Sequence, residues 1–338
     1  MKKVAVFNDT SGGRHFGCVA VMTNLVTLLL QNNMEPHFFW PVGVDWRSHK
    51  EEIVKHLDGL DAIIVNGEGT IHNDITRTRA ASLLELGQFC RHELNKPCFL
   101  VNATLHNISD EGVSLLSQFD RIFVRDSNSE NFLRTKAIST ARTFDLSLFG
   151  LIGKNYKPHK GTTASTPAKT LFTGSVVSTT DIELKKLSLK LAAKFQDIRP
   201  PVKAPQKIMN KIRRLLHISN NGGRTTLRYE NDHQQWLEKI TSYELVVCGR
   251  FHAATLCTGT FTPFVALESN TPKVSCFLND VFGNVDRLFS TAQIAEAVQK
   301  KENLNFTQDE TQSIINYLES GEQTCETMMD EIYHAIKA

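Results

Sequence analysis

Three polar stretches of this sequence could carry chemistry, and each one follows a short apolar run. The first, NDTSGGRHFGC from Asn8 to Cys18, offers the carboxylate of Asp9 and the imidazole of His15 around a pair of glycines. Glycines let a backbone turn tightly against a ligand, and helix N-termini attract anions. The stretch therefore predicts a binding loop, with an ordinary glycine turn as the alternative. Its spacing matches neither the dinucleotide-binding nor the P-loop fingerprint.

The second stretch reads NGEGTIHND and contains Asn66, Gly67, Glu68, Gly69 and Thr70. Core packing is a poor explanation for a carboxylate that stands between two glycines directly after an apolar run. The glycine amides could bind an anion, while Glu68 could act as a base or hold a sugar hydroxyl. His72 and Asp74 follow closely, but they lack a third clustered ligand, so no metal site is expected.

The third stretch, VVCGRFHAA, places Arg250 and His252 two residues apart after an apolar run, and it leads to Glu268. A guanidinium suits a carboxylate or phosphate, and an imidazole suits proton transfer. A lone histidine is more often structural. The Arg-x-His pair at the end of a strand favours a catalytic role instead.

Short apolar runs alternate with amphipathic segments along the first half of the chain. The runs are Val4–Phe7, Ala62–Val65, Cys98–Val101 and Ile122–Val124, and the helical segments are Gly17–Gln31, Arg79–Glu93 and Ser127–Arg134. This alternation predicts a parallel sheet covered on both faces. Ligands bind such sheets beyond the carboxyl ends of the strands, where the three stretches and Arg125-Asp126 all lie.

The second half repeats the pattern. Strands are expected at Thr170–Val177, Glu244–Cys248 and Pro263–Leu267, and helices at Asp181–Phe195, His252–Cys257, Ala292–Lys301 and Asp309–Ile336. Between the halves, Gly150–Ala168 is rich in Gly, Pro, Ser and Thr, which is typical of a linker.

We therefore expect an α/β fold with two Rossmann-like domains whose parallel sheets face a central cleft. The first domain covers residues 1–150, the linker 151–168 and the second domain 169–338. The last helix could pack back on the first domain. A length of 338 residues agrees with two domains, since a typical domain has ~150 residues.

The charge is balanced overall, with 38 basic and 36 acidic residues and a net charge of +2, so a nucleic-acid partner is not expected. One segment departs from this balance. Ile198–Tyr229 holds eight Lys or Arg residues and no acidic residue. It is interpreted either as a solvated loop or as a contact with an anionic membrane surface or a diphosphate-bearing acceptor.

The start of the chain, MKKVAVFNDT, has four uninterrupted apolar residues, too few for a signal peptide. No stretch approaches the ~20 apolar residues of a transmembrane helix. The seven cysteines are odd in number and form no CxxC pair, which favours reduced thiols. We expect a cytoplasmic protein, at the inner face of the membrane if the basic segment binds lipid.

Four motifs together resemble one known family. They are GEGT after an apolar run, VRDSNSENFL, FDLSLF, and VVCGRFHAATLCTGTFTPFVALESNTPKV. The chain resembles the polysaccharide pyruvyl transferase family over residues 4–285, most specifically in the last motif. The resemblance implies the two-domain GT-B architecture of glycosyltransferases. It also implies transfer of a pyruvyl group from phosphoenolpyruvate onto two hydroxyls of a sugar, forming a ketal on a cell-surface glycan.

Residue by residue, Arg250 and His252 match the family's Arg-x-His pair, Arg125 and Asp126 its Arg-Asp motif, and Lys273 its downstream lysine. The resemblance implies that the cationic residues bind phosphoenolpyruvate and that His252 protonates its methylene carbon. Glu68 or His106 would accept the proton of the acceptor hydroxyl. The residues expected to bind substrate are Asn8, Asp9, His15, Gly67, Gly69, Thr70, Arg125, Asp126, Glu268 and Lys273.

Glu68 stands where the family usually has a run of glycines, and this departure keeps other functions open. One alternative is a GT-B glycosyltransferase that uses a nucleotide-activated sugar, such as a CMP-linked keto acid sugar, with Glu68 or Asp9 as catalytic carboxylate. Another is an inactive glycan-binding member. The expected partners are a small anionic donor and a glycan or lipid-linked saccharide acceptor, with no cofactor and no metal.

Overall fold

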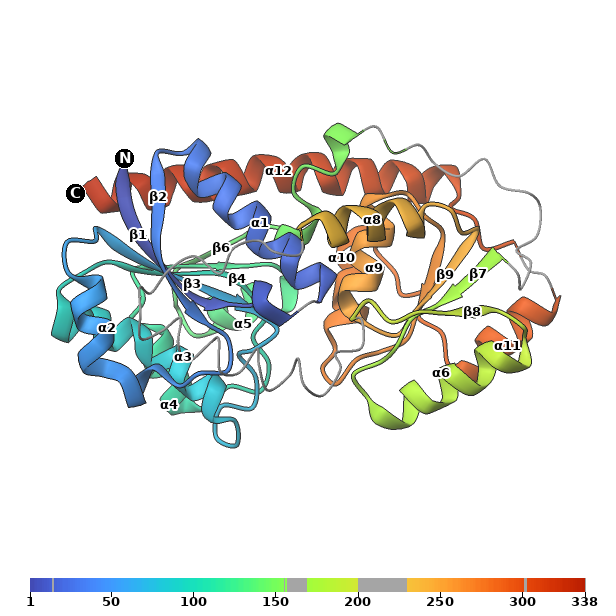
Figure 1. Cartoon of the computed structure of the whole chain (residues 1–338), viewed down its shortest axis with the longest axis horizontal. Helices are drawn as coiled ribbons and strands as arrows, with labels where there is room; N and C mark the ends of the chain where they lie inside the picture. The colour runs from blue at the N-terminus through green and yellow to red at the C-terminus, as the bar shows by residue number, and fades with distance from the viewer. Residues whose placement is uncertain (14, 155, 157–168, 200–229, 301–302, 338) are drawn as a thin grey trace.

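The computed structural model describes residues 1–13, 15–154, 156, 169–199, 230–300 and 303–337 (Figure 1). Within these ranges the chain forms two parallel β-sheets that lie side by side and are covered by helices. The predicted α/β fold class is confirmed. Most of the predicted linker and of the basic segment Ile198–Tyr229, namely residues 155, 157–168 and 200–229, lies outside the described residues.

The first sheet has six strands in the order β2-β1-β3-β4-β5-β6. They are β1 (Lys2–Asp9), β2 (Met34–Pro41), β3 (Ala62–Glu68), β4 (Cys98–Ala103), β5 (Arg121–Val124) and β6 (Thr140–Arg142). All neighbouring pairs run parallel. The strand order reverses between β1 and β3, and in such sheets a ligand crevice forms outside the carboxyl ends at this point.

Helices cover both faces of this sheet because crossovers between parallel strands return along one face or the other. They are η1 (Ser11–Gly13), α1 (Phe16–Gln31), η2 (Trp46–His49), α2 (Lys50–Leu57), α3 (Thr78–Phe89), η3 (Cys90–Leu94), α4 (Asp110–Leu116), α5 (Ser127–Thr135), η4 (Leu146–Leu148) and η5 (Ile152–Lys154). Alternate residues of β1 pack into different apolar clusters. Val4 and Val6 belong to one cluster, and Ala5 and Phe7 belong to the other.

The second sheet has four strands in the order β10-β9-β7-β8, again all parallel. The strands are β7 (Thr170–Phe172), β8 (Lys194–Phe195), β9 (Leu245–Cys248) and β10 (Phe264–Ala266). The helices of this half are α6 (Ser178–Lys190), α8 (Glu230–Ile240), α9 (Phe251–Gly259), α10 (Lys273–Phe282), α11 (Thr291–Lys300) and α12 (Gln308–Lys337). Its order reverses between β7 and β9. Each sheet therefore has its own switch point, as expected for two Rossmann-like halves.

The last helix, α12, runs along both halves (Figure 1). Tyr317 packs against Phe144 with ring centroids 6.2 Å apart, and Glu331 near the end of the helix pairs with Arg121 of β5 at 2.8 Å. One buried apolar cluster includes side chains of both sheets and of α12. The two halves are therefore joined by shared core packing as well as by the connecting chain.

The sequence pattern missed β2 and placed the ends of two elements too late. The strand expected at Thr170–Val177 ends at Phe172. The sequence pattern gave no signal for β2, whose Pro36 is unusual in a strand, but β2 lies at the edge of its sheet, where proline costs no central hydrogen bond. The helix expected at Asp181–Phe195 ends at Lys190, because Ala192 adopts a left-handed φ of 52° and Lys194–Phe195 pairs with β7.

Candidate active site

A cavity of about 440 Å³ lies between the two halves. The first half contributes Thr10, Gly13, His15, Cys18, Val42, Gly43, Glu68, Gly69, Thr70, Arg79 and Arg125, and the second half contributes Val176, Arg199, Arg250, Phe251, His252, Ser269 and Lys273. Most of these residues follow strands at the two switch points. The cavity thus brings together eight of the residues predicted from sequence, namely His15, Glu68, Gly69, Thr70, Arg125, Arg250, His252 and Lys273.

Three helices begin at this cavity. His15 is the N-cap of α1, Arg250 is the N-cap of α9, and Lys273 is the first residue of α10. The unsatisfied N–H groups of a helix N-terminus and the helix dipole both favour a negative ligand. The backbone arrangement therefore favours an anion before any side-chain charge is counted.

The side chains strengthen this preference. Five cationic residues line the cavity, Arg79, Arg125, Arg199, Arg250 and Lys273, against one carboxylate, Glu68. Burial, followed by the charge of Arg125, lowers the pKa of Lys273 to about 8. Burial makes the charged form of this lysine costly, and an anion bound beside it would favour that charged form.

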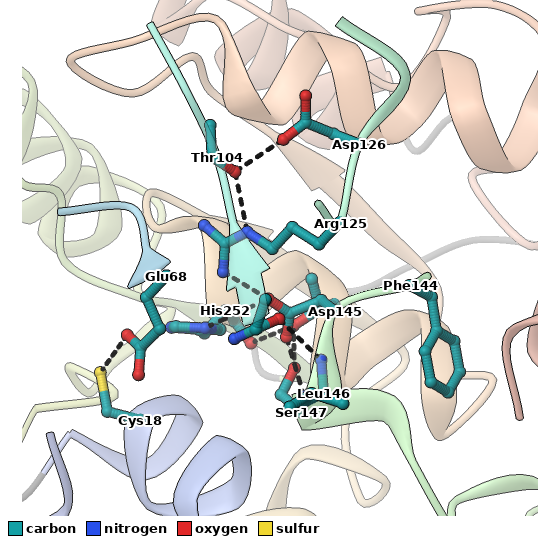
Figure 2. A network of polar contacts seen from close by, with 12 residues as sticks. Cys18, Glu68, Thr104, Arg125, Asp126, Phe144, Asp145, Leu146, Ser147 and His252 are labelled. Atoms are coloured by element: carbon teal, nitrogen blue, oxygen red, sulfur yellow. Dashed lines mark hydrogen bonds and ion pairs between the residues drawn. The ribbon is translucent and has the colours of Figure 1, made fainter. Parts of the chain in front are cut away.

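Arg125 lines the cavity and is held by contacts on several sides (Figure 2). Its Nε donates to Thr104 Oγ1 at 2.8 Å, its Nη1 pairs with Asp145, and its guanidinium lies 4.5 Å from the ring centre of Phe251. The remaining Nη2 faces Gly69, where a Cβ would lie 3.4 Å from Nη2 and 3.5 Å from Lys273 Nζ. Because Gly69 has no side chain, the space beside the Arg125 guanidinium and the Lys273 ammonium group stays open.

Asp145 also reaches the catalytic candidate His252, since Asp145 Oδ2 lies 3.7 Å from His252 Nε2 (Figure 2). Burial alone would raise the pKa of the Asp145 carboxyl, but the charges of Arg125 and His252 lower it overall. One buried carboxylate therefore positions both the arginine and the histidine. His252 is 7% exposed, and its ring meets that of His15 edge-on, with ring centroids 5.2 Å apart.

Burial and the neighbouring His252 lower the pKa of His15 well below its ordinary value. His15 is therefore neutral at neutral pH, and its Nδ1 accepts the backbone N–H of Cys18 at 3.4 Å. It caps α1, and its imidazole ring forms part of the cavity wall. These properties suit a positioning residue.

Glu68 ends β3 with a left-handed φ of 41°, an unusual conformation for a residue other than glycine. Its Oε1 accepts hydrogen bonds from Thr10 Oγ1 at 2.5 Å and Asn66 Nδ2 at 3.1 Å, and its Oε2 accepts from Cys18 Sγ at 3.3 Å. Burial and the Glu68 carboxylate raise the pKa of the Cys18 thiol, so Cys18 remains a donor. The carboxylate is fixed in orientation at the cavity wall.

Arg250 forms two hydrogen bonds with Asp197, from Nε at 3.0 Å and from Nη2 at 3.2 Å. Asp197 lies just beyond β8, so the arginine is positioned across the second switch point. Sequence reasoning missed both Asp145 and Asp197. Asp145 lies inside the FDLSLF motif, which could have identified it, whereas Asp197 carries no comparable signal.

Six other predicted residues do not line this cavity. Asp9 accepts hydrogen bonds from Ser11, Asp126 caps α5, and Glu268 accepts the backbone N–H groups of Val274 and Ser275 at the start of α10. Gly67 packs against Ala103, His106 pairs through its backbone with His72, and Asn8 lines an adjoining cavity. Five of the six thus support the loops around the site.

His15, Cys18 and His252 each bring one metal-ligating atom within 4.8 Å of the others. Two imidazoles and a thiolate form a common zinc-binding set. In this setting the thiol is held protonated by burial and Glu68, and the surrounding cations oppose a divalent ion. The electrostatics of the cavity favour an anion over a metal ion.

Comparison with known proteins places this geometry in context. A sequence profile described as polysaccharide pyruvyl transferase matches residues 15–271. A UDP-forming α,α-trehalose-phosphate synthase from Burkholderia vietnamiensis has a similar structure, with a TM-score of 0.50, 10% identity and 100% of both chains covered. No curated protein matches the sequence.

Two further solved structures are more distant. A functionally uncharacterized Klebsiella pneumoniae protein has a TM-score of 0.48 and 12% identity, over 85% of this chain and 92% of its own. A trehalose-phosphate synthase from Burkholderia xenovorans has a TM-score of 0.48 and 11% identity, over 99% and 98%.

The described residues contain no helix that is long and apolar enough to span a membrane. The paired parallel sheets share the GT-B architecture with the Burkholderia vietnamiensis synthase. The profile match covers well over half of the chain and includes Glu68, Arg125, Arg250 and His252 of the cavity. This chain is a transferase and belongs to the polysaccharide pyruvyl transferase family.

Proposed function

We propose that the enzyme transfers the pyruvyl group of phosphoenolpyruvate onto two hydroxyls of a sugar and so forms a ketal. The observation that carries the proposal is one cavity, lined by Arg125, Arg250, Lys273 and His252, at which three helices begin. Phosphoenolpyruvate has a carboxylate, a phosphate and a carbon that must be protonated. The cavity offers complementary groups for all three.

The donor would occupy the space beside Gly69, where Arg125 Nη2 and Lys273 Nζ both point. Arg125 suits the carboxylate, because a buried guanidinium with a fixed orientation binds a planar anion with high directionality. Lys273 and Arg250 would bind the phosphate together with the N-termini of α9 and α10.

His252 would give its proton to the methylene carbon of phosphoenolpyruvate, converting it into a methyl group. The first acceptor hydroxyl then bonds to the adjacent carbon while Glu68 accepts the hydroxyl proton. The second hydroxyl then displaces phosphate from the same carbon and closes the ketal, and its proton leaves with the phosphate as hydrogen phosphate. Asp145, 3.7 Å from His252 Nε2, would keep the imidazole in place throughout.

The acceptor would be a sugar of a cell-surface polysaccharide or of its lipid-linked precursor. This reaction needs no cofactor, because phosphoenolpyruvate is already activated and phosphate is its leaving group. We place the reaction in the cytoplasm, in keeping with seven cysteines that are all free thiols.

Single substitutions test the two proton-transfer roles. His252→Ala and Glu68→Gln should each abolish ketal formation, measured as the mass gained by a saccharide incubated with phosphoenolpyruvate, while the far-UV circular dichroism stays unchanged. General acid–base catalysis typically contributes about 10²–10⁴-fold, so the losses should be at least of this size. His106→Asn is the matched control, since His106 does not line the cavity, and it should remain active. Full activity of His252→Ala would refute the assignment.

Ligand stabilisation tests the donor independently of the acceptor. Phosphoenolpyruvate at 100 times its Kd should stabilise the fold by about 2.7 kcal/mol and raise the melting temperature, because it binds only the folded state. Lys273→Met should weaken this effect. Stabilisation by CMP or UDP without any effect of phosphoenolpyruvate would instead support a nucleotide-sugar glycosyltransferase on the same fold.

A further inference from the structure

The short segment that follows β8, residues 197–199, belongs to the second half of the molecule but is attached to the first. Ile198 is fully buried, and its backbone oxygen accepts the N–H of Phe16, the first residue of α1, at 3.4 Å. Its side chain belongs to the apolar cluster that contains Phe16 and Trp236 of α8, whose rings stack with centroids 5.4 Å apart. Ile198 therefore anchors this segment to the start of α1.

The residues on either side of this anchor both reach the active site. Asp197 Oδ1 accepts the Nε–H of Arg250 at 3.0 Å and the backbone N–H of Arg199 at 3.2 Å. Arg199 lines the cavity described above together with Arg250. It is also the first basic residue of the basic segment Ile198–Tyr229. One carboxylate thus connects Arg250 to the backbone of a second arginine at the same cavity.

The charge of Arg199 is not balanced in the way that the charges of the other two arginines are. Arg125 pairs with Asp145, and Arg250 pairs with Asp197. The guanidinium of Arg199 forms no ion pair with any residue that the structure describes. A cation beside a carboxylate attracts a further anion less than a cation without one, because the two fields partly cancel. Arg199 therefore adds attraction for an anion that the two paired arginines lack.

The position of Arg199 relates it to the phosphate of the donor more than to its carboxylate. Burial and His252 lower the pKa of His15 most, and the charges of Arg250, Arg199 and Lys273 lower it further, so these three cations all lie near one imidazole. Arg250 and Lys273 are the residues assigned above to the phosphate. A phosphate ester carries a charge of about −1.5 to −2 at pH 7, which favours more than one unpaired cation.

We propose that Arg199 binds the phosphate of phosphoenolpyruvate and that Asp197 and Ile198 hold it in position. The identity of the donor rests on the proposed function, whereas contact of Arg199 with a phosphate group does not. The guanidinium would form charge-assisted hydrogen bonds with the phosphate oxygens. Because Ile198 attaches this segment to α1, the donor would be bound by groups whose positions depend on both halves of the molecule.

Charge removal at Arg199 tests the contact. The variants are Arg199→Gln, which removes the charge, and Arg199→Lys, which keeps it. Lys194→Gln is the matched control, because it removes one charge from an exposed position of β8 that does not line the cavity. Binding of phosphoenolpyruvate, inorganic phosphate and pyruvate to each protein is measured by isothermal titration calorimetry.

We expect Arg199→Gln to bind phosphoenolpyruvate and inorganic phosphate about tenfold more weakly than the wild type, and pyruvate equally well. Arg199→Lys should keep most of the affinity, since an ammonium group also binds phosphate, and Lys194→Gln should behave as the wild type. Unchanged binding of phosphoenolpyruvate by Arg199→Gln would overturn the proposal, and so would an equal loss of pyruvate binding. If inorganic phosphate follows the expected pattern but phosphoenolpyruvate binds to none of the proteins, the proposed donor is refuted and the phosphate contact stands.

A second pair of variants tests the anchor. Ile198→Ala should weaken phosphoenolpyruvate binding, by less than Arg199→Gln does, because the segment that carries Arg199 loses its buried side chain. Ile294→Ala removes the same atoms from a fully buried position in a different apolar cluster and should leave binding unchanged. Melting temperatures establish that both variants are folded during the titration. Equal affinities of the two variants would show that Ile198 does not position Arg199.

Discussion

Lys273 shows how strongly one side chain depends on its surroundings. Burial and the nearby Arg125 lower its pKa to about 8, from an ordinary value of 10.5. Below pH 8 the folded protein carries the full cost of a poorly solvated ammonium group. Between pH 8 and 10.5 the lysine is neutral when folded and charged when unfolded, so the unfolded state binds more protons and stability rises with pH.

We therefore predict that Lys273→Met is more stable than the wild type at pH 7, and that this advantage shrinks as pH rises from about 8 to 10.5. The measurement is the free energy of unfolding in urea at several pH values. Lys186→Met, at an exposed lysine of α6, serves as the control and should show no such trend. An advantage that stayed constant across this pH range would contradict the assigned pKa.

At the scale of elements, α1 packs against the start of α9 so closely that only glycine fits at position 17. A Cβ built on Gly17 would lie 2.2 Å from both Cβ and Cγ of His252. The N-terminal turn of α1 therefore determines where the imidazole of α9 stands. Gly17 therefore allows α1 and α9, two helices from different halves of the molecule, to come into close contact.

Gly17→Ala should displace the His252 ring and lower kcat about 100-fold, because a misplacement of about 1 Å can cost this much. Stability should fall as well, because His252 Cβ is fixed to the backbone of α9 and can yield only if that backbone moves. The helix preference of alanine over glycine, about 1 kcal/mol, offsets only part of this cost. Gly153→Ala is the control, because Gly153 does not line the cavity and a Cβ there meets nothing within 4 Å. Steady-state kinetics together with thermal melting separate the two effects.

At the scale of the whole molecule, α12 links the two halves and packs against Phe144, which lies next to the site. Gly321 of α12 packs against the ring of Phe144, with a built Cβ only 2.1 Å from Phe144 Cδ2. Phe144 directly precedes Asp145, the carboxylate that positions Arg125 and His252. The close approach of α12 thus sets the position of the chain that carries this carboxylate.

Replacing Gly321 by leucine should destabilise the protein by about 1–3 kcal/mol, the usual cost of overpacking a core. Activity should fall as well, because Phe144 can yield only by moving the backbone beside Asp145. Ser320→Leu, one residue earlier and exposed, is the matched control and should leave both properties nearly unchanged. Equal melting temperatures for the two variants would show that α12 does not constrain the site.

Much of this molecule follows from local sequence pattern. Apolar runs of three or four residues predicted β1, β3, β4 and β5. Polar residues just after two of these runs, and after the run that forms β9, predicted that Glu68, Arg125, Arg250 and His252 would gather at the strand ends. These predictions succeed because hydrophobic periodicity and strand ends are local properties, and because parallel strands place all their carboxyl ends at one edge. The same motifs identified the family.

The tertiary structure alone decided the partners of these residues. Asp145 lies 20 residues from Arg125 and Asp197 lies 53 residues from Arg250, while Cys18 reaches Glu68 across 50 residues. Crossover connections create such contacts, and no local pattern records which side chains they bring together. For the same reason two residues that resemble ligand-binding residues in sequence bind helix N-termini instead: Asp126 is the N-cap of α5, and Glu268 accepts backbone N–H groups at the start of α10.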